Sequence, residues 1–172
     1  MIIKIYYFNK KNMDNYIFFL GKSKEYGFLS NFYLTKFNEG KINFNMSEQY
    51  MMYKKAKLFK DEKTAQKILD ADTALGCKKL GRTVKNFDEK TWDENKVAIV
   101  TEGLRLKFTQ NEDLKNKLLA TEDKILAEAS PYDGIWGIGI DKETALKRKP
   151  EEWTGKNLLG KALMKVREEI KN

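Results

Sequence analysis

The chain has 172 residues, of which 41% are hydrophobic and only two are prolines; this excludes a disordered protein and predicts a single domain over residues 1–172. It contains no histidine and one cysteine, Cys77, which excludes the Ser-His-Asp and Cys-His catalytic systems and an ordinary zinc site. The formal charge of +8 either reflects lysine-rich solvated helices or suits an anionic partner such as a phosphorylated nucleotide or a nucleic acid.

The longest apolar runs, such as Tyr16–Leu20, are too short to cross a bilayer, and no signal peptide is apparent at the N-terminus. A single cysteine cannot form an internal disulfide and fits a reducing compartment. We therefore expect a cytoplasmic protein without a membrane partner, a metal or a cofactor. Its chemistry then falls to Asp, Glu, Lys, Tyr, Ser or Thr side chains, or to a hard metal ion on oxygen ligands, for which the sequence gives no positive evidence.

The N-terminal part has the β-branched and aromatic composition of strands. Two strands are predicted at Ile2–Phe8 and Tyr16–Leu20. Further on, Tyr33–Phe37 and Lys41–Asn45 flank Asn38–Gly40, which predicts a hairpin with a glycine turn.

From Ser47 onward the pattern is mainly helical. Four helices are predicted to begin after the N-caps Ser47, Asp61, Asp88 and Asn111. The helix after Asp88 is predicted at Glu89–Thr109, the one after Asn111 ends near Leu119, and a further short helix at Thr73–Leu80 is stopped by Gly81. A strand is predicted within Lys124–Ala129, and a last helix follows Gly160. Apolar side chains at helical spacing predict two buried stripes: Trp92, Val97, Val100, Leu104 and Phe108, then Leu163, Val166 and Ile170. The pattern predicts an α+β fold, predominantly α-helical, with a small N-terminal β-sheet.

The first predicted helix carries a carboxylate and an amine on one face. Glu48 lies in its first turn, where the helix dipole favours an anion, and Lys55 follows seven residues later, two turns along the same face. Such a pair is common on solvated helices, but the apolar segment Tyr50–Tyr53 between them indicates burial. The pair is either surface charge or chemistry.

Two polar residues outside this helix have two interpretations each. Asn31, within the aromatic segment Phe28–Tyr33, is either a turn residue or an amide that faces a ligand. Arg82, directly after the helix stop, either faces solvent or contributes a planar fork of donors to a phosphate.

Two glycine-rich stretches lie in the second half of the chain. Ser130–Gly139 is either a tight structural loop or a wall of a ligand site, with Asp133 as its one carboxylate and Trp136 as a stacking surface. Trp153–Gly160 leads into the last helix, where free backbone amides near Lys156 and Asn157 are a weak candidate for an anion site, because the full phosphate-loop pattern is absent.

Several of these stretches together resemble the NADAR family, which includes the YbiA-like N-glycosidases. The matching pieces are FLSNFY, SEQY with KKA, LGR, a Trp-bearing helix ending in LKF, LLAT, EASPYDGIWGIG and GKNLLGKALMKVR, in the family's order from about Tyr26 to Arg167. The segment Gly139–Thr154 is longer than in the riboflavin-type members and the N-terminal strand begins differently, and both differences bear on substrate choice.

The resemblance implies a YbiA-like fold and hydrolysis of a ribose N-glycosidic bond. Family members act on phosphoribosylamino-pyrimidine intermediates of riboflavin synthesis or remove ADP-ribose from guanine bases, so the implied partners are ADP-ribosyl or phosphoribosyl nucleotides, including ADP-ribosylated DNA or RNA. By its motifs, the resemblance implies catalytic roles for Glu48, Lys55 and Asp133 and substrate-binding roles for Asn31, Arg82, Trp136, Gly137, Asn157 and Gly160.

The residues allow a mechanism without histidine. In our hypothesis Glu48 transfers the proton for ribose ring opening and Lys55 forms a transient Schiff base, while Asp133 holds ribose hydroxyls and Trp136 packs against base or sugar. The alternative for Lys55 is that it only neutralises substrate phosphate. Three functions stay open at this point: a glycohydrolase of ADP-ribosylated guanine, a small-molecule N-glycosidase, or a non-catalytic module that binds ADP-ribosyl or NAD-like ligands.

Overall fold

The structure is a computed structural model that describes residues 13–21 and 25–171. The chain divides into two compact units: one combines the chain up to Ser30 with Asn116 onward, and the other is Asn31–Lys115. Helices predominate and the sheets are small, which confirms the predicted α+β class. The strand predicted at Ile2–Phe8 lies outside the described residues. Among the described helices, none is both long and apolar enough to span a bilayer.

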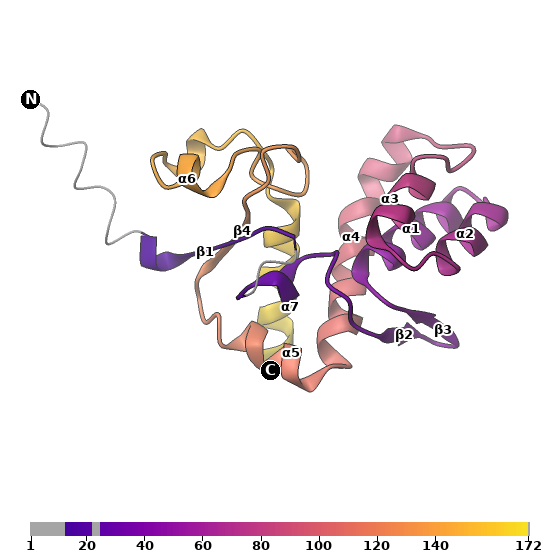
Figure 1. Cartoon of the computed structure of the whole chain (residues 1–172), viewed down its shortest axis with the longest axis horizontal. Helices are drawn as coiled ribbons and strands as arrows, with labels where there is room; N and C mark the ends of the chain where they lie inside the picture. Colours follow the sequence, from indigo (N-terminus) through magenta and orange to yellow (C-terminus); the bar gives the residue numbers. More distant parts are fainter. Residues whose placement is uncertain (1–12, 22–24, 172) are drawn as a thin grey trace, which may run out of the picture. The chain divides into compact units, whose positions relative to one another are not determined.

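The unit Asn31–Lys115 consists of a β-hairpin followed by helices (Figure 1). Its elements are β2 (Phe37–Glu39), β3 (Ile42–Phe44), α1 (Ser47–Leu58), α2 (Glu62–Leu69), α3 (Ala74–Gly81) and α4 (Glu89–Thr109). The strands pair antiparallel, with Phe37 opposite Phe44. The hairpin is therefore confirmed, but Asn38 and Glu39 belong to β2 and the turn comes at Gly40, which has a φ of 61°.

Helix α1 packs against α2, α3 and α4 and forms the centre of this unit. Its start is buried, and the predicted Ser47 cap is wrong: Met46 is the N-cap residue, and it makes no side-chain cap bond. The amide of Gln49 holds the helix start, because its oxygen accepts from the Asn45 N–H at 2.8 Å and its nitrogen donates to the carbonyls of Ile68 and Leu69 at 3.0 Å. Burial of Met46 in the core has thus displaced the cap.

Two of the predicted caps are confirmed. Asp61 accepts from the Thr64 amide at 3.1 Å and Asp88 from the Thr91 amide at 2.7 Å, so each satisfies a free donor at a helix start. The glycine stop of α3 is wrong in detail, because Gly81 is the last helical residue and Arg82 is the C-cap.

The buried face of α4 differs from the predicted stripe. Val100, Leu104 and Phe108 are buried, but Val97 is 40% exposed and Trp92 is only half-buried. The face toward the core instead includes Lys96, Gly103 and Lys107. Successive side chains on a helix point about 100° apart. Because Lys96 faces the core, the next residue, Val97, points away from it.

The other unit is built around a parallel strand pair. Its strands are β1 (Tyr16–Phe19) and β4 (Ile125–Glu128), and its helices are α6 (Lys142–Ala145) and α7 (Leu158–Lys171). It also has three short 3-10 helices, η2 (Met13–Asn15), η3 (Gly27–Leu29) and η4 (Pro150–Glu152). Helix α5 (Glu112–Leu119) contains the chain position at which the two units divide. Tyr16 lies opposite Ile125 in the pair, which confirms both predicted strands. The N-terminal strand is therefore completed by a strand more than 100 residues away in sequence.

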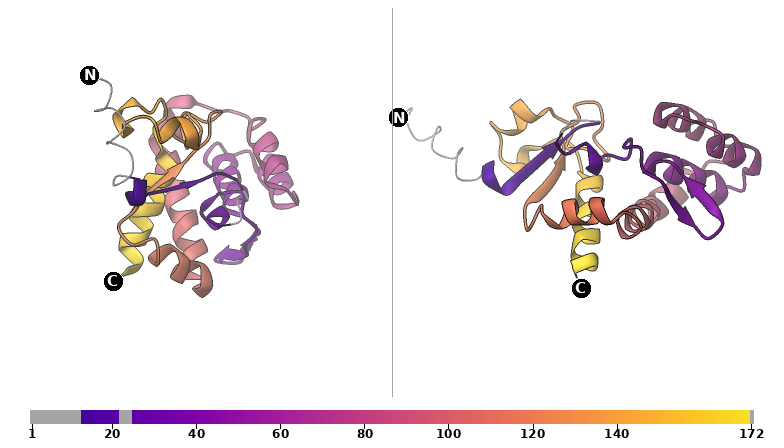
Figure 2. Two further views of the ribbon diagram at one scale, coloured as in Figure 1. Left: turned by 60° about the vertical axis from the view of Figure 1, so that its left-hand side comes forward. Right: turned by 60° about the horizontal axis from the view of Figure 1, so that its bottom comes forward.

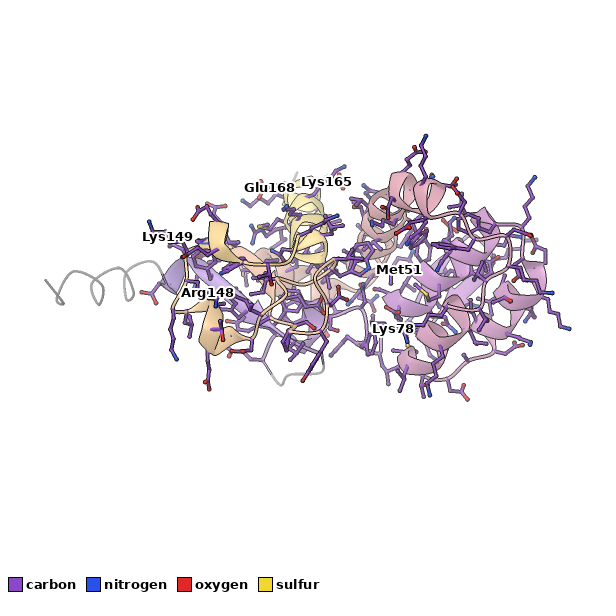
Figure 3. The ribbon with its side chains drawn as sticks, turned by 90° about the horizontal axis from the view of Figure 1, so that it is seen from above. Met51, Lys78, Arg148, Lys149, Lys165 and Glu168 are labelled. Carbon is purple, nitrogen blue, oxygen red and sulfur yellow. The ribbon has the colours of Figure 1, made fainter. Side chains whose placement is uncertain are left out.

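Helix α7 packs on β4 (Figures 1 and 2). Leu163 and Val166 face the core as predicted, and Ile170 is half-buried. The opposite face carries exposed Lys165 and Glu168, both labelled in Figure 3. This unit has a small hydrophobic core that contains Ala127, Ala129, Ile138, Ile140 and Ala145, with Phe18 and Trp153 packed against it.

Candidate active site

The centre of the candidate site is the face of α1 that carries Glu48 and Lys55. Glu48 is 3% exposed and Lys55 is half-buried, so the pair is not ordinary surface charge. Seven residues of helix separate their Cα atoms by about 10.5 Å on one face. Met52 stands between them, and a side chain at Gly81 would overlap its sulfur, so α3 packs closely against this part of α1.

The amine of Lys55 is enclosed by a carbonyl and two aromatic rings. Its Nζ donates to the Gly81 oxygen at 2.9 Å and lies 4.2 Å from the ring centre of Phe87 and 5.5 Å from that of Trp92. Burial lowers the pKa of Lys55 below its ordinary value of 10.5, because the charged form loses water. A lysine with a lowered pKa is closer to the neutral, nucleophilic amine.

Sequence reasoning missed Phe87 and placed Trp92 in the core. The available signal was weak: Phe87 stands directly before the Asp88 cap, and Trp92 is in the first turn of α4. Nothing in the local sequence around Phe87 or Trp92 indicates that either ring contacts Lys55 on α1. Trp92 belongs with Lys55 rather than with the buried stripe.

Asn31 adjoins Glu48. Its backbone oxygen accepts from the Glu48 N–H at 2.9 Å, and the residue is 6% exposed. The side-chain Oδ1 is buried and accepts no hydrogen bond within the described part of the chain. The backbone carbonyl agrees with the turn interpretation of Asn31, and a ligand-facing role for its side chain stays a prediction.

Arg82 follows the residue whose carbonyl binds Lys55. It is exposed and directly follows Gly81, whose carbonyl holds the lysine. Its guanidinium is therefore presented to solvent at the end of α3. Asn31, Glu48, Lys55 and Arg82 all belong to the unit Asn31–Lys115, where Asn31 contacts the start of α1 and the carbonyl before Arg82 binds Lys55.

The single cysteine is part of the wall rather than a nucleophile. Cys77 on α3 is fully buried, and burial together with the negative charge of Glu48 raises the pKa of its thiol to about 11. A thiol with so high a pKa carries almost no thiolate at neutral pH. Across the described residues no group of three acidic or cysteine side chains could hold a metal ion.

The remaining predicted site residues lie in the unit that contains Asn116 onward, and they are Asp133, Trp136, Gly137, Asn157 and Gly160. Oδ1 of Asp133 accepts from the amides of Ile135 at 3.0 Å and Trp136 at 2.8 Å, which closes the glycine-rich loop. A side chain at Gly137 would crowd the carbonyls of Asp133 and Glu128. Their roles toward a substrate stay predictions, and Trp136 is half-buried.

The expected anion site at the start of α7 is wrong. The amides from Gly155 to Leu159 all donate to carbonyls of Gly134 to Ile138, at 2.8–3.2 Å, so they are not free for a ligand. The side chain of Asn157 ties this turn to β4, donating to the Leu126 oxygen at 2.9 Å and accepting from the Glu128 amide at 3.3 Å. Its φ of 50° also shows a structural demand on this residue.

Gly160 allows α7 to approach β4. We expect Gly160→Ala to lower the free energy of unfolding by about 2–4 kcal/mol, because an added Cβ would overlap the Leu126 carbonyl, which is backbone and cannot swing away. Thermal melting measures the change. Gly134→Ala is the matched control, since its Cβ would meet nothing within 4 Å. Equal melting temperatures for the two variants would contradict close helix–strand packing.

Comparison with known proteins shows the family to which the chain belongs. A family model described as the NADAR domain matches residues 18–171. N-glycosidase R617 of Acanthamoeba polyphaga mimivirus is 45% identical over 164 residues, which are 91% of this chain and 96% of that protein. Riboflavin biosynthesis protein VVA0006 of Vibrio vulnificus (strain YJ016) is 33% identical over 158 residues, covering 92% of this chain and 39% of that protein. The NMR structure of the E. coli protein YbiA superimposes with a TM-score of 0.75 at 30% identity, covering 92% of this chain and 86% of that one.

The enzyme class follows from these matches: the chain is an N-glycosidase, a hydrolase of N-glycosyl bonds. It belongs to the NADAR domain family, as the sequence motifs predicted.

Proposed function

We propose that the chain removes ADP-ribose from guanine bases of nucleic acid by hydrolysing the bond between ribose and base. The observation that carries the proposal is the pair on α1, a buried carboxylate at Glu48 and an enclosed amine at Lys55 on one helix face. Arg82 is exposed and directly follows Gly81, whose carbonyl binds Lys55, and a guanidinium suits the diphosphate of ADP-ribose. The formal charge of +8 supports an anionic substrate.

Glu48 and Lys55 together supply a complete reaction sequence. Glu48, as the acid, protonates the ribose ring oxygen; the bond from this oxygen to the anomeric carbon breaks, and the lone pair of the base nitrogen forms an iminium. The neutral Nζ of Lys55 adds to the anomeric carbon and loses a proton to the Glu48 carboxylate.

Release of the base and of the sugar uses the same two groups. Glu48 returns the proton to the base nitrogen as its bond to the anomeric carbon breaks, which leaves an imine between sugar and lysine. Water adds to this imine, with Glu48 as base, and the adduct collapses to ribose aldehyde and free Lys55. No other nucleophile is required.

A small-molecule substrate is the alternative. The relative named riboflavin biosynthesis protein VVA0006 matches 92% of the chain, which favours a phosphoribosylamino-pyrimidine as the second candidate. The test incubates the protein with an oligonucleotide carrying ADP-ribose on one guanine and, separately, with that pyrimidine, and measures product masses. Release of ADP-ribose with restored guanine supports the proposal; release of ribose 5-phosphate from the pyrimidine alone supports the alternative.

The pH dependence of turnover follows from Glu48 and Lys55. Because the first step needs a protonated Glu48 and a neutral Lys55, the two groups must together hold one proton, and we expect a bell-shaped dependence of kcat/KM on pH. Burial lowers the pKa of Lys55, so the falling limb of the bell is expected below the ordinary lysine value of 10.5. The measurement is a pH–rate profile with a correction for protein unfolding. A profile that is flat, or that keeps rising past pH 10.5 without a falling limb, would contradict a reaction that needs both groups.

A further inference from the structure

The end of α3 and the connection to α4 carry an uninterrupted positive charge. Residues 78–87 contain four cations and no acid, and we name these cations, Lys78, Lys79, Arg82 and Lys85, the cationic strip. Lys79, Arg82 and Lys85 are exposed and Lys78 is half-buried. Within the described residues none of the four forms an ion pair, whereas Lys54, Lys57 and Lys171 are each paired with an acid.

The backbone under the cationic strip is well ordered. The Thr83 amide donates to the Leu80 oxygen at 2.8 Å, and the Lys85 amide donates to the buried carboxylate of Asp61 at 2.9 Å. Val84 is buried between them. The cations therefore project from a defined turn, and a ligand that binds them has little backbone to order.

Aromatic rings accompany the cationic strip. Phe87 is 45% exposed, packs edge-on against Phe59 at 5.3 Å and covers the amine of Lys55. At the other end, Lys78 lies 5.8 Å from the ring centre of Phe32, and in Figure 3 it lies on α3, beside the helix that carries Met51. Cations that follow a backbone together with an exposed ring for a base are the combination that binds single-stranded nucleic acid.

We propose that the lysines of the cationic strip and Phe87 bind single-stranded nucleic acid, the lysines holding its phosphodiesters and the Phe87 ring stacking on a base, while Arg82 keeps its role toward the diphosphate. The inference rests on the proposed function, since the strand held here is the one that carries the modified guanine. The helix dipole accounts for Lys78 and Lys79 in the last turn of α3, but its effect ends within that turn. It does not account for Arg82 and Lys85, which follow the helix.

Binding of a fluorescent 12-nucleotide single-stranded DNA without modification tests the strip directly. For Lys79→Ala/Lys85→Ala we expect weaker binding and a salt dependence of log K that is shallower by about 1.4, because each phosphate that the protein no longer neutralises reduces the slope by about 0.7. The matched control is Lys63→Ala/Lys67→Ala, two exposed lysines on α2 in the same unit. An unchanged slope, or the same weakening in the control, would overturn the strip as the binding surface.

The stacking contribution has its own variant. Phe87→Leu keeps an apolar contact with Phe59 but removes the aromatic face, so we expect affinity for the same DNA to fall about 5-fold or more with an unchanged salt slope. An unchanged affinity would overturn stacking on Phe87.

Turnover separates this inference from the proposed function. With Lys79→Ala/Lys85→Ala, KM for the ADP-ribosylated oligonucleotide is expected to rise about 5-fold or more, while kinetics on ADP-ribosylated guanosine stay unchanged. An equal effect on both substrates would overturn the inference. If wild-type protein releases ADP-ribose from neither, the proposed function fails, and the unmodified DNA still decides whether the strip binds nucleic acid.

Discussion

Replacement of Lys55 by arginine is expected to lower kcat by about 10³-fold or more, although the positive charge is kept. A guanidinium stays protonated and cannot form an imine, whereas it can still pair with phosphate. The position is confined by the Gly81 carbonyl and by the rings of Phe87 and Trp92, which hold the amine in one place. Single-turnover rates on the ADP-ribosylated oligonucleotide measure the decrease.

Borohydride trapping provides the direct readout for the same residue. Reduction during turnover should add the mass of the sugar moiety to wild-type protein, with the modified peptide containing Lys55, and should add nothing to Lys55→Ala. Lys54→Arg is the matched control, because Lys54 is the adjacent lysine of α1 and pairs with Glu39 instead. Near-normal turnover by Lys55→Arg, without an adduct in wild type, would point to direct attack by water with a phosphate-binding lysine.

Glu48→Gln is expected to lower kcat by about 10²–10⁴-fold with little change in KM, since the amide keeps the shape of the carboxyl group but transfers no proton. Glu62→Gln is the matched control, because Glu62 is also an acid in the first turn of a helix and shares any effect on the helix dipole. Steady-state kinetics and thermal melting are measured on both.

The two measurements separate catalysis from stability. Glu48 is buried at the crowded start of α1, so a purely structural role would lower the melting temperature and leave the kcat of the folded fraction unchanged. That result would contradict proton transfer by Glu48. An effect confined to KM would assign it to substrate binding.

The local part of the fold was predictable from neighbouring residues. The bounds of α4 and the caps at Asp61 and Asp88 follow from short-range hydrogen bonds between a side chain and an amide three residues away. The placement of Glu48 and Lys55 on one face follows from the helical period alone. The cap at Ser47 failed because Met46 is drawn into the core, which no local rule contains.

The absence of histidine and the pairing of Glu48 with Lys55 on one helix were determined by the sequence itself, since composition and helical period need no tertiary information. Only the tertiary structure decided that Phe87 covers Lys55 and that the carbonyls of Gly134 to Ile138 occupy the amides at the start of α7. These contacts join residues between 17 and 32 positions apart, so they depend on how whole elements pack. Propensity and spacing describe each element alone, and the free energy of packing selects among their possible partners.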